Sequence, residues 1–307
     1  MPGKKREKKV ELIRTPWGFY QYQPLPNEAE LRAFYADKYY LALGYLHEDN
    51  QDAVQASYTE EEVSWLRLRS WISYRKIEQM LPGKSPVTLL DVGCGEGWLM
   101  DIFYSNGHSV MGLDFSKAGI EKLHPHLLYF FEQGNIYDLL DHIVNRKEQF
   151  DVISLCNVIE HVSYPVQLLQ NVKQIMHPGS LLALMVPNDF SHLQKHLLKR
   201  KFVKEEWWLC YPEHISYFNK ESMCNLLKDL GFEIKSIIAD HPIDLNLLND
   251  NSNYVNDRSK GKNTQLFRVR ADNFLGSIDR EKLLGLYEIL GSMGVGRNLF
   301  YVCSLLK

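Results

Sequence analysis

The segment LLDVGCGEGW at positions 89–98 places three glycines, Gly93, Gly95 and Gly97, at alternate positions after an apolar run. Glycine lets a backbone turn tightly and approach a ligand closely, and a helix that begins there supplies free N–H groups. The spacing differs from the G-x-G-x-x-G fingerprint of dinucleotide-binding loops, whose longer last interval seats a pyrophosphate. Asp91 would repel a pyrophosphate but can pair with a ligand amine, directly or through water. A glycine turn without a ligand is the alternative.

A second acid, Asp114, follows the next apolar run, residues 109–113. It lies seventeen positions after Gly97. Asp114 at that point can accept hydrogen bonds from both hydroxyls of an unphosphorylated ribose. A single acid at the end of a strand is also a common helix cap, and Ser116 offers a rival cap. In combination with the glycine turn, Asp114 predicts a ribose-binding residue.

Two histidines lie next to acids in later segments of the chain, and both are candidates for proton transfer. A histidine beside a carboxylate suits the removal of a proton from a hydroxyl, because its pKa lies near neutrality. His214 is the first candidate for a general base and His161 the second, with Asp189 or Glu213 as the orienting acid. The alternative is structural: His214 would orient the helix that follows it, and His161 would hold a loop.

The apolar pattern after residue 83 alternates short runs with helical stretches, which predicts a mainly parallel sheet with crossover helices. Two connections in this region, residues 189–219 and 241–296, exceed the ~12–15 residues usual in a compact domain and are expected to form lids or insertions. The second contains several asparagines, which could bind a hydroxylated or phosphorylated acceptor or form a solvated loop. Strands are expected at Thr88–Val92, Ser109–Leu113, Phe150–Leu155, Leu181–Val186, Ile234–Ile238 and Leu299–Leu305.

The N-terminal residues 1–83 are expected to form a helical, aromatic-rich cap in front of a core at 84–307. Capping patterns at 27–30 and 59–62 each predict a helix start, because a polar N-cap is followed three residues later by Glu. A Leu81-Pro82-Gly83 turn predicts the end of the second helix. Aromatic residues are concentrated in this cap and in residues 202–218, which suggests that both contribute to the substrate side.

Composition excludes several classes of protein. A net charge of −3 gives no basic field for a nucleic-acid polymer. No apolar run approaches the ~18–20 residues of a membrane helix, so no membrane association is expected. The five cysteines are scattered and form no C-x-x-C pair, which disfavours a zinc or disulfide framework and indicates a reducing, cytoplasmic location.

The chemistry-bearing segments, in this order and spacing, resemble the class I S-adenosylmethionine-dependent methyltransferases. The resemblance implies an α/β fold: a Rossmann-like, seven-stranded, mainly parallel sheet with helices on both faces. It spans about residues 85–240. Its matching pieces are DVGCGEG at 91–97, GLDFS at 112–116, GNI at 134–136, FDVI at 150–153, NVIEHV at 157–162 and MHPGS at 176–180.

The resemblance also implies roles for individual residues. The glycine loop would hold the methionine part of S-adenosylmethionine and Asp114 its ribose, while Phe115 would pack on the adenine face. Asn135, followed by Ile136, stands where the family commonly has Asp, and its carbonyl can still accept from the adenine amino group. Cys156 and Asn157 would lie beside the sulfonium, although Cys156 is equally a small buried hydrophobe.

The acceptor is less well defined by the sequence. Residues 206–218 resemble a segment of a subgroup whose members modify sugars or secondary metabolites in bacterial polysaccharide and natural-product pathways. This implies a small acceptor with a hydroxyl or amine, with a sugar or nucleotide-sugar as the best single guess. No metal is expected, since Asn157 replaces the first acid of a Glu-x-x-Glu-His pattern and leaves weak ligation for magnesium. The alternative functions are a nicotinamide-dependent reductase and a non-catalytic scaffold. The sequence does not determine the oligomeric state, and a homodimer is one possibility.

Overall fold

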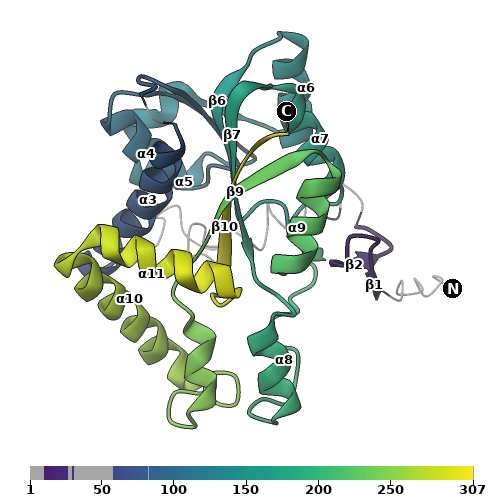
Figure 1. Cartoon of the computed structure of the whole chain (residues 1–307), viewed down its shortest axis with the longest axis vertical. Coiled ribbons are helices and arrows are strands. Elements are labelled where there is room, and N and C mark those ends of the chain that lie inside the picture. The colour runs from purple at the N-terminus through teal and green to yellow at the C-terminus, as the bar shows by residue number, and fades with distance from the viewer. Residues whose placement is uncertain (1–9, 27–29, 31–57, 82, 307) are drawn as a thin grey trace, which may run out of the picture.

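A seven-stranded sheet runs through the centre of the computed structural model, which describes residues 10–26, 30, 58–81 and 83–306 (Figure 1). Its strand order is β5-β4-β3-β6-β7-β10-β9. The first five strands pair in parallel, whereas β10 is antiparallel to both of its neighbours. The predicted fold class is confirmed. The strands are β3 (Thr88–Val92), β4 (Ser109–Asp114), β5 (Phe131–Gln133), β6 (Phe150–Cys156), β7 (Met176–Pro187), β9 (Phe232–Ala239) and β10 (Asn298–Leu305).

The apolar pattern did not single out β5, because this strand has only three residues and lies at the edge of the sheet. A run of that length is too short for a periodicity to be recognised. The other six strands match the expected runs, with the parallel strand β7 beginning five residues earlier than predicted, at Met176 rather than Leu181.

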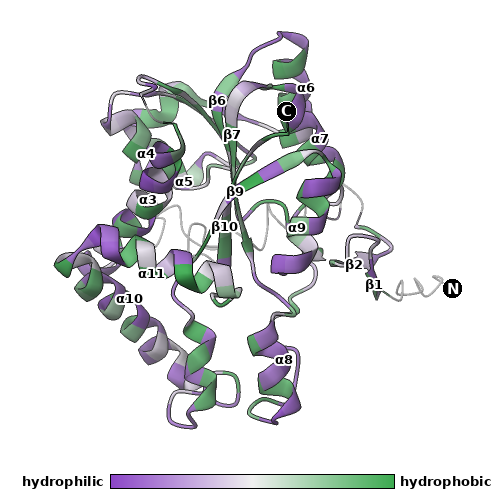
Figure 2. Cartoon of the chain, in the orientation of Figure 1, coloured by the Kyte–Doolittle hydropathy of each residue, from purple (hydrophilic) through white to green (hydrophobic). Residues whose placement is uncertain are grey.

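Helices cover both faces of the sheet, as Figure 1 shows. A separate apolar cluster lies on each face, with fully buried side chains such as Ile77 and Met100 on one and Leu169 and Leu226 on the other. Figure 2 shows the largely green, hydrophobic strands between helices that carry both hydrophobic and hydrophilic residues. One layer contains α3 (Glu60–Met80), α4 (Trp98–Ser105), α5 (Ala118–Leu123) and α11 (Arg280–Met293), and the other contains α6 (Ile136–Asn145), α7 (Pro165–Gln174) and α9 (Lys220–Asp229).

Helix α3 begins where the capping pattern predicts. The Thr59 side chain accepts from the Glu62 backbone N–H, and the Glu62 carboxylate accepts from the Thr59 backbone N–H at 2.8 Å. Leu68 and Ile72 of this helix belong to the same apolar cluster as the neighbouring strands. Helix α3 is therefore one layer of the core, and residue 83 does not separate a cap from it.

The prediction of a helical cap at residues 1–83 is wrong for residues 11–23. Residues Glu11–Arg14 (β1) and Tyr20–Gln23 (β2) form a hairpin that pairs with Ser216–Tyr217 (β8) in a second, antiparallel sheet. The sequence YQYQ of β2 alternates aromatic and polar residues, a period of two that suits a strand. The predicted helix start at residues 27–29 lies outside the described residues.

The two insertions are more regular than loops. Residues 189–219 contain α8 (His192–Lys199), and residues 241–296 contain α10 (Gly261–Ile278) and α11. The buried Asn253 amide donates to the backbone carbonyls of Phe202 and Leu247, at 2.9 and 3.0 Å. Asn256 also donates to the Phe202 carbonyl. These asparagines therefore join the two insertions, a role that neither sequence alternative included. None of the helices in the described ranges is long and apolar enough to cross a membrane.

Candidate active site

The glycine loop leaves the carboxyl end of β3 with all three glycines at positive φ: 71° at Gly93, 54° at Gly95 and 81° at Gly97. The Gly93 N–H donates to the Leu113 carbonyl at 2.7 Å, which fixes the loop to β4. A Cβ at Gly93 would lie 2.4 Å from a methyl of Val158, whereas a Cβ at Gly95 would meet nothing within 4 Å. Gly93 is thus required by packing, and the space over Gly95 is open to a ligand.

The two acids of the predicted cofactor site lie on either side of this loop. Asp91 is 3% exposed and accepts a hydrogen bond from the Ser154 hydroxyl. Burial raises the pKa of Asp91 to about 6, and the charge of Asp114 adds to that effect while Ser154 opposes it. Asp114 accepts from the backbone N–H groups of Gly95, at 2.9 Å, and Ser116, at 3.0 Å. It therefore also holds the loop that would bind the ligand.

The residues expected around adenine come from the ends of β4 and β5. Phe115 is 38% exposed, which leaves an aromatic face for stacking. Asn135 has a role that the sequence analysis did not give it, because its carbonyl accepts from the Tyr137 backbone N–H at 2.9 Å and caps α6. Ile136 begins α6 and packs against the apolar core.

Asn157 stands at the carboxyl end of β6 in the left-handed region, with φ 56°. Its backbone N–H donates to the Met185 carbonyl at 2.9 Å, and its amide nitrogen lies 3.9 Å from the Met185 sulfur. The preceding Cys156 is half-buried, and burial raises the pKa of its thiol well above the usual value, so it stays a neutral, apolar neighbour. Cys156 packs against one of the apolar clusters, and its position beside the sulfonium stays a prediction.

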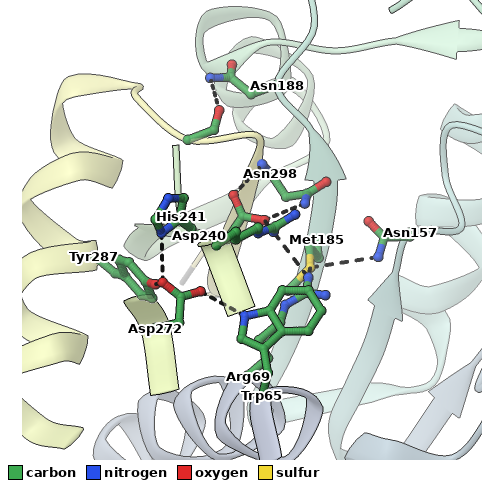
Figure 3. Close-up of polar contacts among 12 residues, drawn as sticks. Trp65, Arg69, Asn157, Met185, Asn188, Asp240, His241, Asp272, Tyr287 and Asn298 are labelled. Carbon is green, nitrogen blue, oxygen red and sulfur yellow. Dashed lines mark hydrogen bonds and ion pairs between the residues drawn. The ribbon is translucent and has the colours of Figure 1, made fainter. Parts of the chain in front are cut away.

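Arg69 of α3 lies near Asn157 of the candidate site, and the sequence analysis did not single it out. Figure 3 shows its guanidinium reaching Met185, which also contacts Asn157. The Arg69 Nη2 atom lies 3.8 Å from the Met185 sulfur and 4.0 Å from the Asp240 carboxylate. Burial and the positive charge of Arg268 lower the Arg69 pKa. The signal was a cation four residues after the buried Trp65, on the apolar face of a helix.

A dense polar network, which we call the Asp272 network, lies next to Arg69 and includes Asp240, which Arg69 approaches (Figure 3). Asp272 accepts from the Trp65 indole at 2.8 Å, from His241 Nδ1 at 2.8 Å and from the Tyr287 hydroxyl at 2.7 Å. Burial opposes ionisation of Asp272, but these hydrogen bonds outweigh it and hold its pKa below the usual value. The network consists of Trp65, Asp240, His241, Arg268, Asp272, Tyr287 and Asn298. It joins α3, α10 and α11 to β9 and β10.

The two histidine segments meet in space. The rings of His161 and His214 lie 4.7 Å apart, edge to face. The Ile215 backbone N–H donates to the Glu160 carbonyl at 2.8 Å, and His161 Nδ1 lies 2.7 Å from the Glu213 carbonyl. Because a carbonyl only accepts, that Nδ1 carries the proton. The backbone thus clamps both histidines together.

Glu160, His161 and His214 form what we call the Glu-His-His cluster, whose ligand atoms all lie within 4.8 Å of one another. Both carboxylate oxygens of Glu160 and the Nδ1 atom of His214 are buried and have no hydrogen-bond partner within residues 10–26, 30, 58–81 and 83–306. Burial raises the pKa of Glu160 to about 8 and lowers the pKa of His161 to about 4 and of His214 to about 3. The cluster is therefore neutral near pH 7.

The predicted orienting acids do not contact the histidines as expected. Asp189 is 1% exposed and its carboxylate accepts from Arg297 at 2.7 Å, so its charge is paired with that cation. Glu213 holds His161 through its backbone carbonyl and not through its carboxylate. Arg297 is a second residue that the sequence analysis missed, because it lies far along the chain, just before β10.

The family model of a methyltransferase domain matches residues 60–237, more than half of the chain. The chain belongs to this methyltransferase family. The resemblance to class I S-adenosylmethionine-dependent methyltransferases is thereby confirmed. The match begins at α3 and ends in β9, and so includes the glycine loop and the Glu-His-His cluster.

Two of the curated relatives of this methyltransferase share less than a third of their residues with it over the matched parts. It is 29% identical to a ubiquinone biosynthesis O-methyltransferase of Haemophilus ducreyi over 40% of this chain and 55% of that protein. It is 24% identical to a probable S-adenosylmethionine-dependent methyltransferase of Mycolicibacterium smegmatis over 58% of this chain and 63% of that one. The chain thus spans about half the length of the first curated relatives it matches.

One solved structure shares the fold over most of its length. It is the plantazolicin methyltransferase BamL, crystallised with a triazolic desmethylPZN analog and S-adenosylhomocysteine. The TM-score is 0.53 with 13% identity, and the match covers 90% of this chain and 94% of that one. At this identity the likeness concerns the fold alone.

Proposed function

We propose that this protein transfers a methyl group from S-adenosylmethionine to a hydroxyl of a small, ring-containing acceptor. The observation that carries the proposal is a single turn, residues 157–161, which joins the two halves of the site. Asn157 lies at the cofactor side, and His161 of the same turn contacts His214. The donor and the proton-accepting groups therefore come from neighbouring ends of parallel strands, where open α/β sheets bind ligands.

The residues of the glycine side fit the predicted cofactor. The open space over Gly95 admits a ligand to the loop, and Asp114 offers acceptors to a ribose. In this proposal Asp91 attracts an ammonium group of the cofactor, directly or through water. The bound cofactor supplies an electrophilic methyl on a good leaving group. The chain itself has to bind and align the two substrates.

The acceptor side carries aromatic residues next to His214. Tyr217 donates its hydroxyl to the His214 carbonyl at 3.0 Å, and Tyr22 lies 5.8 Å from the Tyr217 ring. Tyr211, 38% exposed, packs edge-on against Tyr22 at 4.8 Å. Such rings stack against the face of a sugar or of a phenol, and a sugar acceptor stays a prediction. Trp208 and Tyr217 are only 2% and 1% exposed, so much of the aromatic excess of residues 202–218 packs inside the protein, and the exposed Tyr211 is the ring that an acceptor would contact.

Proton removal from the acceptor falls to the Glu-His-His cluster, with His214 as the first candidate for the base. Its Nδ1 atom is buried and has no hydrogen-bond partner among the described residues, so the base role requires that the acceptor displaces the side chains that cover this atom. A buried neutral imidazole is a weak base, and the proton would move as the methyl is transferred rather than before. His161 is fixed by the Glu213 carbonyl and would position its neighbour.

Two measurements test this function. Calorimetric titration of the protein with S-adenosylhomocysteine, NAD and NADP should give binding of the first alone. Incubation with methyl-labelled S-adenosylmethionine and a panel of sugars, nucleotide-sugars and phenols should then transfer label to at least one hydroxyl. Tight binding of NAD without S-adenosylhomocysteine would overturn the proposal in favour of a reductase. Cofactor binding with no transfer to any acceptor in the panel would favour the non-catalytic scaffold.

A further inference from the structure

The Glu-His-His cluster holds three metal-ligand side chains in one buried place. Glu160 is 1% exposed, and among the described residues neither of its carboxylate oxygens has a hydrogen-bond donor. The Nδ1 atom of His214 is also buried without a partner in that part of the chain. Unsatisfied buried polar atoms of this kind are costly, and a cluster of them in a native fold indicates a bound group that completes their interactions.

The orientation of His161 matches that of a metal ligand. Its Nδ1 atom faces the Glu213 carbonyl at 2.7 Å, which leaves the Nε2 atom 3.8 Å from a carboxylate oxygen of Glu160. Histidines that bind metals usually donate their other ring N–H to a carbonyl or carboxylate, which fixes the tautomer and the ring. The backbone of residue 213 provides that contact here.

The cluster is rigid because its two segments are tied by the backbone. The Glu160 carbonyl accepts from the N–H groups of Ile215, at 2.8 Å, and Ser216, at 3.1 Å. Ligand atoms at about 2.0–2.2 Å from an ion are roughly 3.4 Å apart in a tetrahedron, and the three atoms here lie within 4.8 Å of one another. Small side-chain rotations close that difference without moving the backbone.

The donor set selects the type of ion. Two imidazoles and one carboxylate suit Zn²⁺ or Fe²⁺, whereas Mg²⁺ and Ca²⁺ prefer oxygen ligands. The expectation of no metal considered only Glu160 and His161, which are adjacent in the sequence. The third ligand, His214, comes from the far side of an insertion and is brought in by the fold.

We propose that Glu160, His161 and His214 bind one divalent transition-metal ion at the acceptor side of the site. The role of this ion rests on the proposed function: three protein ligands leave positions for an acceptor that carries two neighbouring oxygens, such as a vicinal diol or an ortho-diphenol. In that case His214 is a ligand of the ion, which positions the acceptor, and His214 does not act as the general base.

The test uses the full chain after treatment with a chelator. Titration with Co²⁺, followed by its visible absorption, and competition with Zn²⁺ should give one tight site, with Mg²⁺ failing to compete. His214→Ala and Glu160→Gln should each weaken Zn²⁺ binding by about 100-fold or more. His126→Ala is the matched control, because His126 is an exposed histidine that contacts Asp101 at 2.9 Å, and it should leave binding unchanged.

The outcomes separate this inference from the proposed function. Zn²⁺ affinity that is the same in His214→Ala and in the unaltered chain would overturn the site, since the ion would then bind elsewhere. Absence of a Zn²⁺ site in a chain that still binds S-adenosylhomocysteine would overturn the metal and leave the methyltransferase activity standing. Circular dichroism and the thermal midpoint of each variant show whether it is folded, and Glu160→Gln keeps the test valid should His214→Ala not fold.

Discussion

Two buried acids in this protein have opposite surroundings. Asp272 is 3% exposed and accepts hydrogen bonds from Trp65, His241 and Tyr287. Glu160 is 1% exposed, and neither of its carboxylate oxygens accepts a hydrogen bond from the part of the chain that the structure describes. A buried carboxylate with full partners stabilises the fold around it, while one without partners costs stability and persists where a ligand needs it. The contrast distinguishes a structural network from a candidate site better than burial or charge alone.

The largest expected effect is on turnover, at the Glu-His-His cluster. His214→Ala should lower turnover by about 10²–10⁴ with little change in cofactor affinity, because it removes a group that handles the acceptor. The free energy of unfolding should fall only by the packing that the ring makes with His161 and Tyr217, since the lost Nδ1 atom has no hydrogen bond among the described residues. Single-turnover kinetics and urea unfolding measure the two quantities, with His126→Ala as the control. Near-normal turnover would return His214 to a structural role.

The Asp272 network should respond in the opposite way. Asp272→Ala should reduce the free energy of unfolding by about 3 kcal/mol or more, because it leaves three buried donors without an acceptor. Asp229→Ala is the matched control, as Asp229 accepts from the Trp17 indole at an exposed position, and it should cost less than about 1 kcal/mol. Urea denaturation measures both. A loss as small as that of the control would mean that the network contributes little to the fold.

Asp114 sharpens the comparison because its carboxylate already accepts two hydrogen bonds and also lies at the proposed ligand site. Asp114→Ala should weaken S-adenosylhomocysteine binding by about 1–3 kcal/mol, through lost hydrogen bonds to the ribose and to the Gly95 and Ser116 backbone. Calorimetry gives this number, and Asp114→Asn should recover part of it. An unchanged affinity would show that the ribose lies elsewhere.

Asp91 is the intermediate case, a buried acid with one hydroxyl partner. Its pKa of about 6 predicts that cofactor affinity falls about tenfold between pH 7 and pH 5, as the carboxylate becomes neutral and loses its attraction for an ammonium. Asp91→Asn should bind weakly at both pH values. The folded chain takes up this proton more readily than the unfolded chain, so the same group makes the fold more stable as pH falls from about 6 to 4. A flat affinity profile in the unaltered protein would contradict the pairing.

The smallest expected change removes one hydrogen bond from the Asp272 network. Trp65→Phe keeps the aromatic ring but loses the indole N–H that donates to Asp272 at 2.8 Å. It should reduce the free energy of unfolding by about 1 kcal/mol, in contrast to Trp17→Phe at the surface, which should be close to neutral. Thermal and urea unfolding of the two variants provide the comparison, and equal losses would argue against a special role for the buried bond.

Much of the cofactor side could be predicted from the sequence because its residues are local to strand ends. Gly93, Asp91 and Asp114 each follow an apolar run, and parallel strands bring their carboxyl ends to one edge. The N-cap at Thr59 could also be predicted, because a capping box involves residues three apart in the sequence. The hairpin of β1 and β2 was not, because its strands are four residues long and a third strand from residues 216–217 completes the sheet.

The sequence by itself determined the sheet, the glycine loop and the acids beside it, since these follow from local periodicity and from spacing along the chain. Only the tertiary structure decided what the buried polar residues do. Asp189 forms an ion pair with Arg297 and not with a histidine. His214, near the end of the first insertion, lies close to Glu160 and His161. Whether a buried polar atom has a partner depends on contacts between distant segments, and no local pattern encodes them.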